Sequence, residues 1–194
     1  HAAIGGSLGG MQVLEWLLDH PGEIERAAII CASSALSAQN IAFSTAARSA
    51  IMRDPAFRGG DYPDGEGPDV GLAVARMVGH ITYLSEGGMQ ERFGRRRRDG
   101  RTDARLEDAE TWLGTAFEVE SYLNHQASSF LRRFDALSYL WLSRVMDFFD
   151  PFADREAVAA SIARQPDARQ LVLSFDSDWR FPTSHSTRIA TELR

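Results

Sequence analysis

The chain has 194 residues, of which 44% are hydrophobic and 25% charged, and its formal net charge is −6 at pH 7. This composition is typical of a globular protein rather than a disordered or fibrous chain, and the acidic balance argues against nucleic acid as a partner. No apolar run approaches the roughly 18 residues of a membrane helix, and no secretory signal opens the chain, so we expect a cytoplasmic protein without a membrane partner.

The first 36 residues predict a strand, a tight glycine turn, a helix and a second strand. The helix MQVLEWLLDH ends at Pro21 and Gly22, and the apolar run AAIICAS provides the second strand. Both strands are continuous apolar runs, which is the pattern of parallel strands buried on both faces and joined by a crossover helix. Cys31, the only cysteine, lies in the second run. We therefore expect it to be a buried, reduced thiol.

Residues from about 37 to 150 have a different, helical character. Apolar positions recur at helical spacing in four segments, 41–52, 70–84, 109–134 and 136–149. REAVAASIARQ predicts another helix, and QLVLSFDSD returns to a buried-strand pattern. Strands on both sides of a helical block are typical of a helical cap inserted into an α/β sheet. We predict an α/β core from 1–36 and 151–194, with a cap over 37–150.

Two further segments are expected to be loops. Residues 54–68, DPAFRGGDYPDGEGP, are rich in Gly, Pro and Asp and predict irregular structure. Arg95–Arg98, with Arg101, form a basic cluster in an acidic chain. Two interpretations of this cluster remain open: a solvated surface loop, or an anion site for the phosphates of a bulky cofactor.

Residues Gly5–Gly9 read GGSLG, which satisfies the pattern G-x-S-x-G between a buried strand and a helix. At such a turn a nucleophilic serine adopts a strained backbone, and small residues two positions away let strand and helix pass closely. Ser7 is then the candidate nucleophile, and the Leu8 N–H is the candidate oxyanion donor. The alternatives are a glycine turn with an incidental serine, or a phosphate loop, whose Gly-Lys-Ser/Thr is absent.

An elbow serine needs an orienting acid and a base, which follow it along the chain in that order. The strand LVLSF leads into a polar loop, where Asp178 is our candidate acid and Asp176 the reserve. Alternatively, either aspartate caps the helix that Pro182 introduces.

None of the five histidines fits the base: His1, His20, His80, His125 and His185. The first two come too early, the next two fall in cap helices where a structural histidine is commoner, and the last is too close to Asp178. We expect the base beyond Arg194, which would leave this chain inactive or nearly so by itself.

Several long segments resemble the homoserine O-acyltransferases of the α/β-hydrolase superfamily: GGSLGGMQVLEW, GLAVARMVGHITYLS, RFGR, FEVESYLNHQASSFLRRFDALSYLWLSRVMDFFD and SFDSDWRFP. The resemblance extends from residue 2 to about residue 186. Leu8 stands where the family usually has Met, which leaves a main-chain N–H unchanged. The resemblance implies a partial α/β-hydrolase fold, a fragment without the family's early strands and without the Gly-His-Asp segment that carries the base.

The resemblance also implies the reaction. Ser7 would take an acetyl group from acetyl-CoA and pass it to the hydroxyl of L-homoserine, a step of methionine biosynthesis. Asp178 would orient the base, and Arg76 and Tyr83 would contact the substrate, with the guanidinium binding a carboxylate. Neither a metal nor a resident cofactor is expected. Succinyl-CoA as donor, serine or another alcohol as acceptor, an esterase, and a non-catalytic binding protein remain alternatives.

The cap is the expected surface of a homodimer. Its helices carry more apolar and aromatic side chains than one buried face requires: Trp112, Phe117, Tyr122, Phe130, Tyr139, Trp141, Phe148 and Phe149. Packing in the core of the cap is the alternative explanation for part of this set.

Overall fold

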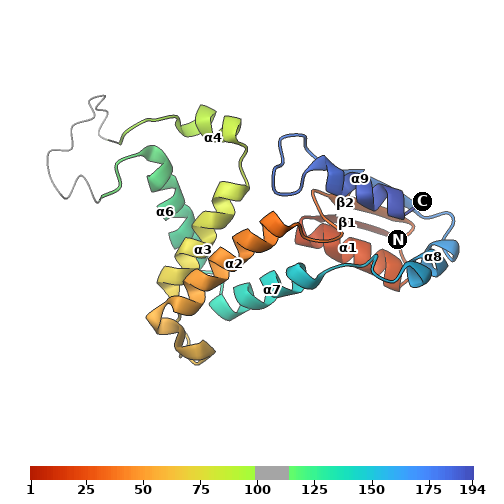
Figure 1. The fold of residues 1–194 in the computed structure, drawn as a ribbon, viewed down its shortest axis with the longest axis horizontal. Helices are drawn as coiled ribbons and strands as arrows, with labels where there is room; N and C mark the ends of the chain where they lie inside the picture. The colour runs from red at the N-terminus through yellow and green to blue at the C-terminus, as the bar shows by residue number, and fades with distance from the viewer. Residues whose placement is uncertain (99–113) are drawn as a thin grey trace. The chain divides into compact units, whose positions relative to one another are not determined.

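The computed structural model describes residues 1–98 and 114–194, and they form two compact units (Figure 1). The first unit comprises His1–Ile41 with Leu142–Arg194, and the second comprises Ala42–Trp141. The chain passes from the first unit to the second within helix α2 (Ala38–Arg53) and returns within helix α7 (Ala136–Phe148). The second unit lies within residues 37–150, the range that we expected for the cap, and the boundaries of the cap stay a prediction.

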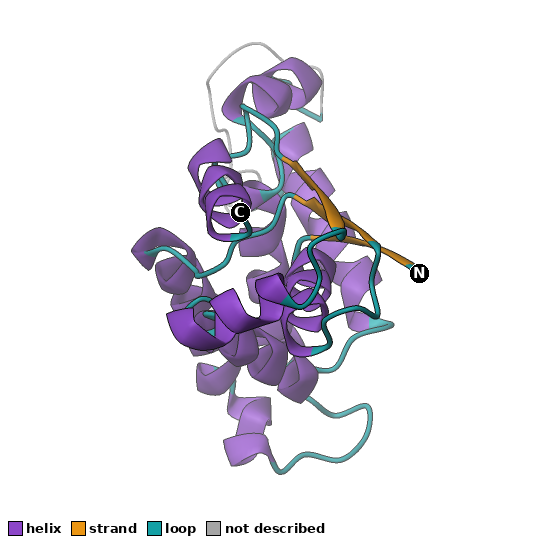
Figure 2. Cartoon of the chain, turned by 90° about the vertical axis from the view of Figure 1, so that its right-hand side faces the viewer, coloured by secondary structure: helices purple, strands orange, loops and turns teal. Residues whose placement is uncertain are grey.

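The first unit contains a three-stranded parallel sheet in the order β1-β2-β3 (strands orange in Figure 2). The strands are β1 (Ala2–Gly6), β2 (Arg26–Ile30) and β3 (Arg169–Leu173), and helix α1 (Leu8–Asp19) is the crossover between the first two. The parallel sheet with a crossover helix confirms the prediction from the apolar runs.

Helices α1 and α9 (Thr183–Glu192) pack against one face of this sheet, and α8 (Arg155–Ala163) packs against α1 and contributes Val158 to the same core. Ala27 and Ile29 of β2 are buried there, and the register aligns Ile29 with Gly5 and Val172. On the opposite face Ile4 and Leu171 are 76% and 60% exposed. The expectation that the strands are buried on both faces is therefore wrong for the described residues, because these helices cover a single face.

The second unit is helical. It contains a 3-10 turn (Pro55–Gly60), α3 (Asp69–Thr82), α4 (Glu86–Phe93) and α6 (Glu118–Leu131), besides parts of α2 and α7. Its core joins side chains of α2, α3, α6 and α7: Ala47, Ile51, Leu72, Ala75, Phe130 and Ala136. Gly71 lets α3 approach α2 closely, since a Cβ there would lie 2.4 Å from the Ala50 carbonyl oxygen.

Two segments of the second unit differ from expectation. The 3-10 turn lies inside 54–68, which we expected to be irregular; Asp54 begins it by accepting the Ala56 N–H at 2.9 Å, and its other oxygen accepts the Gly71 N–H at 2.8 Å. Helix α4 was not anticipated, and Ser85 caps it by accepting the Gly88 N–H at 3.1 Å. Within the described ranges, no helix is both long and apolar enough to cross a membrane.

Candidate active site

Ser7 lies at the sharp turn between β1 and α1. Its backbone has φ 55° and ψ −122°, a left-handed conformation that an L-residue adopts only when its surroundings impose it. The surroundings here are two main-chain hydrogen bonds: the Ser7 N–H donates to the Ile30 carbonyl at 2.9 Å, and the Ser7 carbonyl accepts from the Met11 N–H at 3.1 Å. The side chain is exposed and makes no capping bond to α1. The hydroxyl is thus presented at the surface, as a nucleophile at an elbow requires.

Glycines allow strand and helix to approach at this turn, although not the pair that we expected. A Cβ on Gly5 would lie 2.1 Å from the Gly9 carbonyl oxygen, and one on Gly10 would lie 2.8 Å from the Ala32 Cβ. A Cβ on Gly9 would meet no described atom within 4 Å. The close approach of strand and helix therefore depends on Gly5 and Gly10. Our expectation that position 9 requires a small residue is wrong for the atoms that the structure describes.

The N-terminus of α1 begins directly after Ser7. Leu8 is its first residue, so the Leu8 N–H has no acceptor one turn earlier within the helix. The first turn of α1 carries no acidic residue, so its positive dipole end is not offset locally. The arrangement can stabilise an anionic oxygen near Ser7, and the oxyanion role of Leu8 stays a prediction.

Asp178 is fixed within the loop after β3. Its Oδ1 accepts the N–H groups of Arg180 at 2.9 Å and Phe181 at 2.8 Å, and its own N–H donates to the Phe175 carbonyl at 3.2 Å. Asp178 is half-buried, whereas Asp176 is exposed. The N-cap of α9 is Pro182, without a capping side chain. Capping of that helix by either aspartate, the alternative we considered, is therefore wrong, because Asp178 binds the turn before it.

The carboxyl ends of parallel strands meet at the same edge of a sheet, so Ser7, Cys31 and the loop containing Asp178 follow the ends of β1, β2 and β3 there. The Cys31 N–H continues the ladder by donating to the Leu173 carbonyl at 2.8 Å. At about 4.8 Å between neighbouring strands, the ends of β1 and β3 lie about 10 Å apart. The sheet order therefore brings the candidate nucleophile and the candidate acid loop to one edge, on either side of Cys31.

Cys31 is only partly buried, contrary to our expectation of a buried thiol, and its φ is 47°. Strand β2 ends one residue earlier, at Ile30, so Cys31 lies in the turn that follows the strand. Burial, followed by the nearby Asp178 carboxylate, raises the pKa of the Cys31 thiol, while a hydrogen bond to the Phe175 main chain acts in the opposite direction. The pKa of the Cys31 thiol therefore depends on the charge of Asp178.

Arg76 and Tyr83 belong to the second unit and lie close to each other, as their spacing on one helix predicts. The Arg76 guanidinium carbon lies 4.5 Å from the Phe130 ring centroid and 5.8 Å from that of Tyr83. The Arg76 Nε is buried and has no partner among the described residues. Tyr83 follows the end of α3 and is exposed. Contact with a substrate stays a prediction for both.

His80 lies on α3 between these two residues. Its Nδ1 shares a 2.9 Å hydrogen bond with the Tyr122 hydroxyl of α6, and its ring meets the rings of Tyr83 and Tyr122 edge to face. Burial, followed by the charges of Arg76 and Arg133, lowers the pKa of His80. His80 therefore links two cap helices as a neutral imidazole, in keeping with the structural role expected for it.

The basic cluster is exposed at Arg95, Arg96 and Arg98. Its main chain pairs with the segment before α6: the Arg98 N–H donates to the Ala116 carbonyl at 3.0 Å, and the Arg96 carbonyl accepts the Glu118 N–H at 3.0 Å. Arg101 lies outside the described residues, as does Trp112 of the expected dimer surface. An anion site here stays a prediction.

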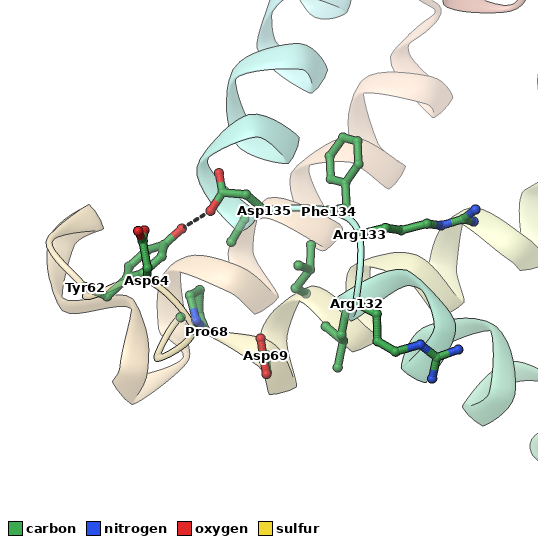
Figure 3. A pocket seen from close by; sticks show the side chains of 13 residues that line it. Tyr62, Asp64, Pro68, Asp69, Arg132, Arg133, Phe134 and Asp135 are labelled. Atoms are coloured by element: carbon green, nitrogen blue, oxygen red, sulfur yellow. Dashed lines mark hydrogen bonds between the residues drawn. The ribbon is translucent and has the colours of Figure 1, made fainter.

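One cavity, of about 360 Å³, lies in the second unit and contains none of the predicted site residues (Figure 3). Tyr62 and Asp135 face each other at its wall, where the Tyr62 hydroxyl donates to Asp135 at 2.9 Å and accepts the Leu137 N–H at 3.2 Å. These bonds hold the start of α7 to the loop between the 3-10 turn and α3. Among residues 1–98 and 114–194, no group of three His, Cys, Asp or Glu side chains could hold a metal ion.

Comparison with known proteins agrees with this geometry. Residues 1–193 match the family model described as alpha/beta hydrolase fold. The chain belongs to the alpha/beta hydrolase family. A crystal structure of homoserine O-acetyltransferase from Bacillus anthracis matches this alpha/beta hydrolase chain with a TM-score of 0.80 and 20% identity, over 99% of this chain and 49% of that one. At that identity the match speaks for the fold.

Two curated relatives are much closer in sequence. The homoserine O-succinyltransferase of Nocardioides sp. is 53% identical over 196 residues, which cover 100% of this alpha/beta hydrolase chain and 50% of the relative. The homoserine O-acetyltransferase of Gluconobacter oxydans is 49% identical over 194 residues, covering 99% and 49%. The resemblance to homoserine O-acyltransferases is thus confirmed, and the chain spans about half the length of these relatives.

Proposed function

We propose that the natural protein containing this chain is a homoserine O-acyltransferase that uses Ser7 as its nucleophile. The proposal is carried by the combination of the exposed Ser7 hydroxyl at a left-handed turn with relatives about half identical to this chain that are named for this activity. An elbow serine alone would fit many reactions of this fold. The named relatives favour acyl transfer to homoserine.

In the proposed reaction the Ser7 oxygen attacks the thioester carbonyl of an acyl-CoA. The Ser7 proton passes to a histidine base, which we expect beyond Arg194. The base returns this proton to the sulfur as the C–S bond breaks, so that CoA leaves as its thiol. The homoserine hydroxyl then attacks the acyl-enzyme, its proton goes to the same base, and the Ser7 oxygen leaves and regains a proton. The Leu8 N–H would stabilise each oxyanion, and Asp178 would orient the base.

The donor is proposed to be acetyl-CoA. The two relatives described above divide between succinyl and acetyl transfer, so their names alone favour neither. Succinyl-CoA is the alternative, and it differs by a carboxylate that would need a cationic or hydrogen-bonding partner in the acyl pocket. A direct comparison of the two thioesters on the same enzyme decides between them.

Arg76 and Tyr83 are proposed to hold the amino-acid substrate. The Arg76 guanidinium is stacked on the Phe130 ring, and its Nε is buried without a described partner. A stacked guanidinium is oriented in advance, so it can bind a carboxylate through two parallel hydrogen bonds with less loss of side-chain entropy. The α-carboxylate of homoserine is such a group, and the adjacent Tyr83 hydroxyl would supply a further hydrogen bond.

A homodimer through the cap helices and a cytoplasmic location complete the proposal. Trp141 and Phe148 of α7 are exposed, which supports a contact surface on this helix. Phe130, Tyr139 and Phe149 pack into the cores instead, so core packing accounts for that part of the aromatic set.

The test is transfer by the natural full-length protein, given L-homoserine with acetyl-CoA or succinyl-CoA. Release of the CoA thiol measures turnover, and mass spectrometry separates O-acyl-homoserine from the free acid. We expect mainly O-acetyl-homoserine, a slower reaction with succinyl-CoA, and a loss on the order of a thousandfold or more in Ser7→Ala. Asp176→Asn is the matched control and should stay close to wild type. Mainly free acid would identify an esterase, and unchanged turnover in Ser7→Ala would overturn the proposal.

A further inference from the structure

Asn40 is a buried amide that connects the start of α2 to the loop after β3. It is 2% exposed. Its Nδ2 donates to the main-chain carbonyl of Arg180 at 2.8 Å and to the Ser37 Oγ at 3.0 Å, and its own N–H also donates to the Ser37 Oγ at 3.2 Å. All three residues belong to the first unit. A single buried side chain therefore joins two segments that lie 140 positions apart in the sequence.

The carbonyl that Asn40 binds belongs to the same peptide group as the Phe181 N–H. That N–H donates to Asp178 Oδ1 at 2.8 Å, so the peptide between Arg180 and Phe181 accepts from Asn40 at one end and donates to Asp178 at the other. Hydrogen bonds in such a chain polarise one another, which strengthens both. The Arg180 N–H reaches the same oxygen at 2.9 Å. Asn40 therefore binds the same peptide group that holds the Asp178 carboxylate in place.

Burying the Asn40 amide costs free energy, and the hydrogen bond to the Arg180 carbonyl explains why an amide nevertheless occupies this position. The Asn40 Oδ1 is buried with no partner among the described residues, and a buried polar atom left unpaired is destabilising. An apolar side chain of similar size would avoid that cost but could not bind the Arg180 carbonyl. An amide at this position is therefore better explained by the hydrogen bond it donates than by packing.

We propose that Asn40 is a positioning residue for Asp178, fixing the peptide that binds Asp178 Oδ1 so that Oδ2 is the oxygen directed at the base. The inference rests on the proposed role of Asp178 as the orienting acid. Asn40 touches neither substrate nor a reacting atom. Its loss should reduce the reactivity of Ser7 without weakening the binding of homoserine.

The test is a double-mutant cycle in the natural full-length protein. The readout is the rate at which a fluorophosphonate probe modifies Ser7, which requires neither homoserine nor acyl-CoA. Asn40→Leu should slow the modification by on the order of tenfold to a hundredfold in the wild-type background. In the Asp178→Asn background the same change should alter the rate less than about twofold, because the carboxylate it positions is gone. Ser37→Ala, which removes the other partner of the Asn40 amide, is the matched control and should retain most of the rate.

If Asn40→Leu slows the modification of Ser7 by the same factor in both backgrounds, its role is structural and the inference is overturned. An unchanged rate in folded Asn40→Leu would also overturn the inference, and so would an unchanged rate in Asp178→Asn. Asn40→Ala, which removes the amide donor without adding a charge, repeats the test if Asn40→Leu lowers the melting temperature. Normal, Asn40-dependent labelling of Ser7 in a protein that does not acylate homoserine would instead overturn the proposed function and leave the inference standing.

Discussion

Gly5 and Gly9 approach so closely that a Cβ atom on Gly5 would stand 2.1 Å from the Gly9 carbonyl oxygen, whereas a Cβ on Gly9 would meet no described atom within 4 Å. The two glycines of the motif therefore differ in what they tolerate. Gly5→Ala should lower the free energy of unfolding by about 3 kcal/mol, since the backbone of strand or helix must move. Gly9→Ala should be neutral or stabilise α1 by about 0.5 kcal/mol. Chemical denaturation of both variants measures this, and equal destabilisation would contradict it.

The charge of Asp178 should control the reactivity of Cys31. The thiolate is the form that alkylates, and the Asp178 carboxylate contributes to the raised pKa of the thiol. Asp178→Asn keeps an oxygen for the two main-chain donors and removes the charge, so the Cys31 pKa should fall and its reaction with iodoacetamide at pH 7.5 should become several-fold faster. Peptide-resolved mass spectrometry measures the rate. Asp176→Asn is the control, and an acceleration equal to that of Asp178→Asn would speak against a specific effect.

Arg76 and Tyr83 should affect the second half of the proposed reaction. Arg76→Lys keeps the charge but loses the planar pair of donors, so KM for homoserine should rise about tenfold or more. Formation of the acyl-enzyme from acyl-CoA, followed as a burst of CoA release without homoserine, should stay within about twofold. Tyr83→Phe isolates the hydroxyl and should show a smaller change in the same direction. A slower burst with an unchanged KM would remove these residues from the acceptor site.

Acid should weaken the cap through His80. An unfolded histidine has a pKa of about 6.5, and burial, Arg76 and Arg133 lower the pKa of His80 in the folded protein. The folded state thus binds this proton more weakly than the unfolded state. The stability contributed by neutral His80 is complete above about pH 6.5 and is lost as the pH falls from there through the folded pKa.

His80→Gln should therefore reduce the drop in melting temperature between pH 7.5 and pH 5, because glutamine does not titrate. A remaining drop is expected, since burial and Arg188 also lower the pKa of His185, against an opposing effect of Asp178. The same pH dependence in His80→Gln and wild type would refute the assignment to His80.

The strand-turn-helix at Ser7 could be predicted because its determinants are adjacent in sequence. An apolar run, glycines and a second apolar run are enough to locate the turn. Where the helix begins was harder to predict: α1 starts at Leu8 rather than Met11, because Gly9 and Gly10 have low helix propensity but follow directly on the turn. Helix α4 was missed for the same reason, since Gly87 and Gly88 occupy its first turn.

The contacts that complete the site could not be read from local sequence. Ser7 and Asp178 each sit in a recognisable motif, but the partner of Asn40 lies 140 positions away, and only the fold brings them together. The available signal was modest: Ser37 and Asn40 have the spacing of a helix cap, which suggests capping and nothing further. The exposure of Ile4 was also not predictable, because an apolar strand indicates a preference for burial and not which helices are present to cover it.

The sheet face that carries Ile4 and Leu171 is exposed, and this exposure affects how the polypeptide would behave in solution. Ile4, Ala28 and Leu171 align across the three strands, so the row they form is continuous from one edge of the sheet to the other. Such a row, in a sheet whose outer strands β1 and β3 have no further strand partner among the described residues, is a template for association. If these residues were produced by themselves, colloidal stability would be the first property to fail, and mild detergent should restore it.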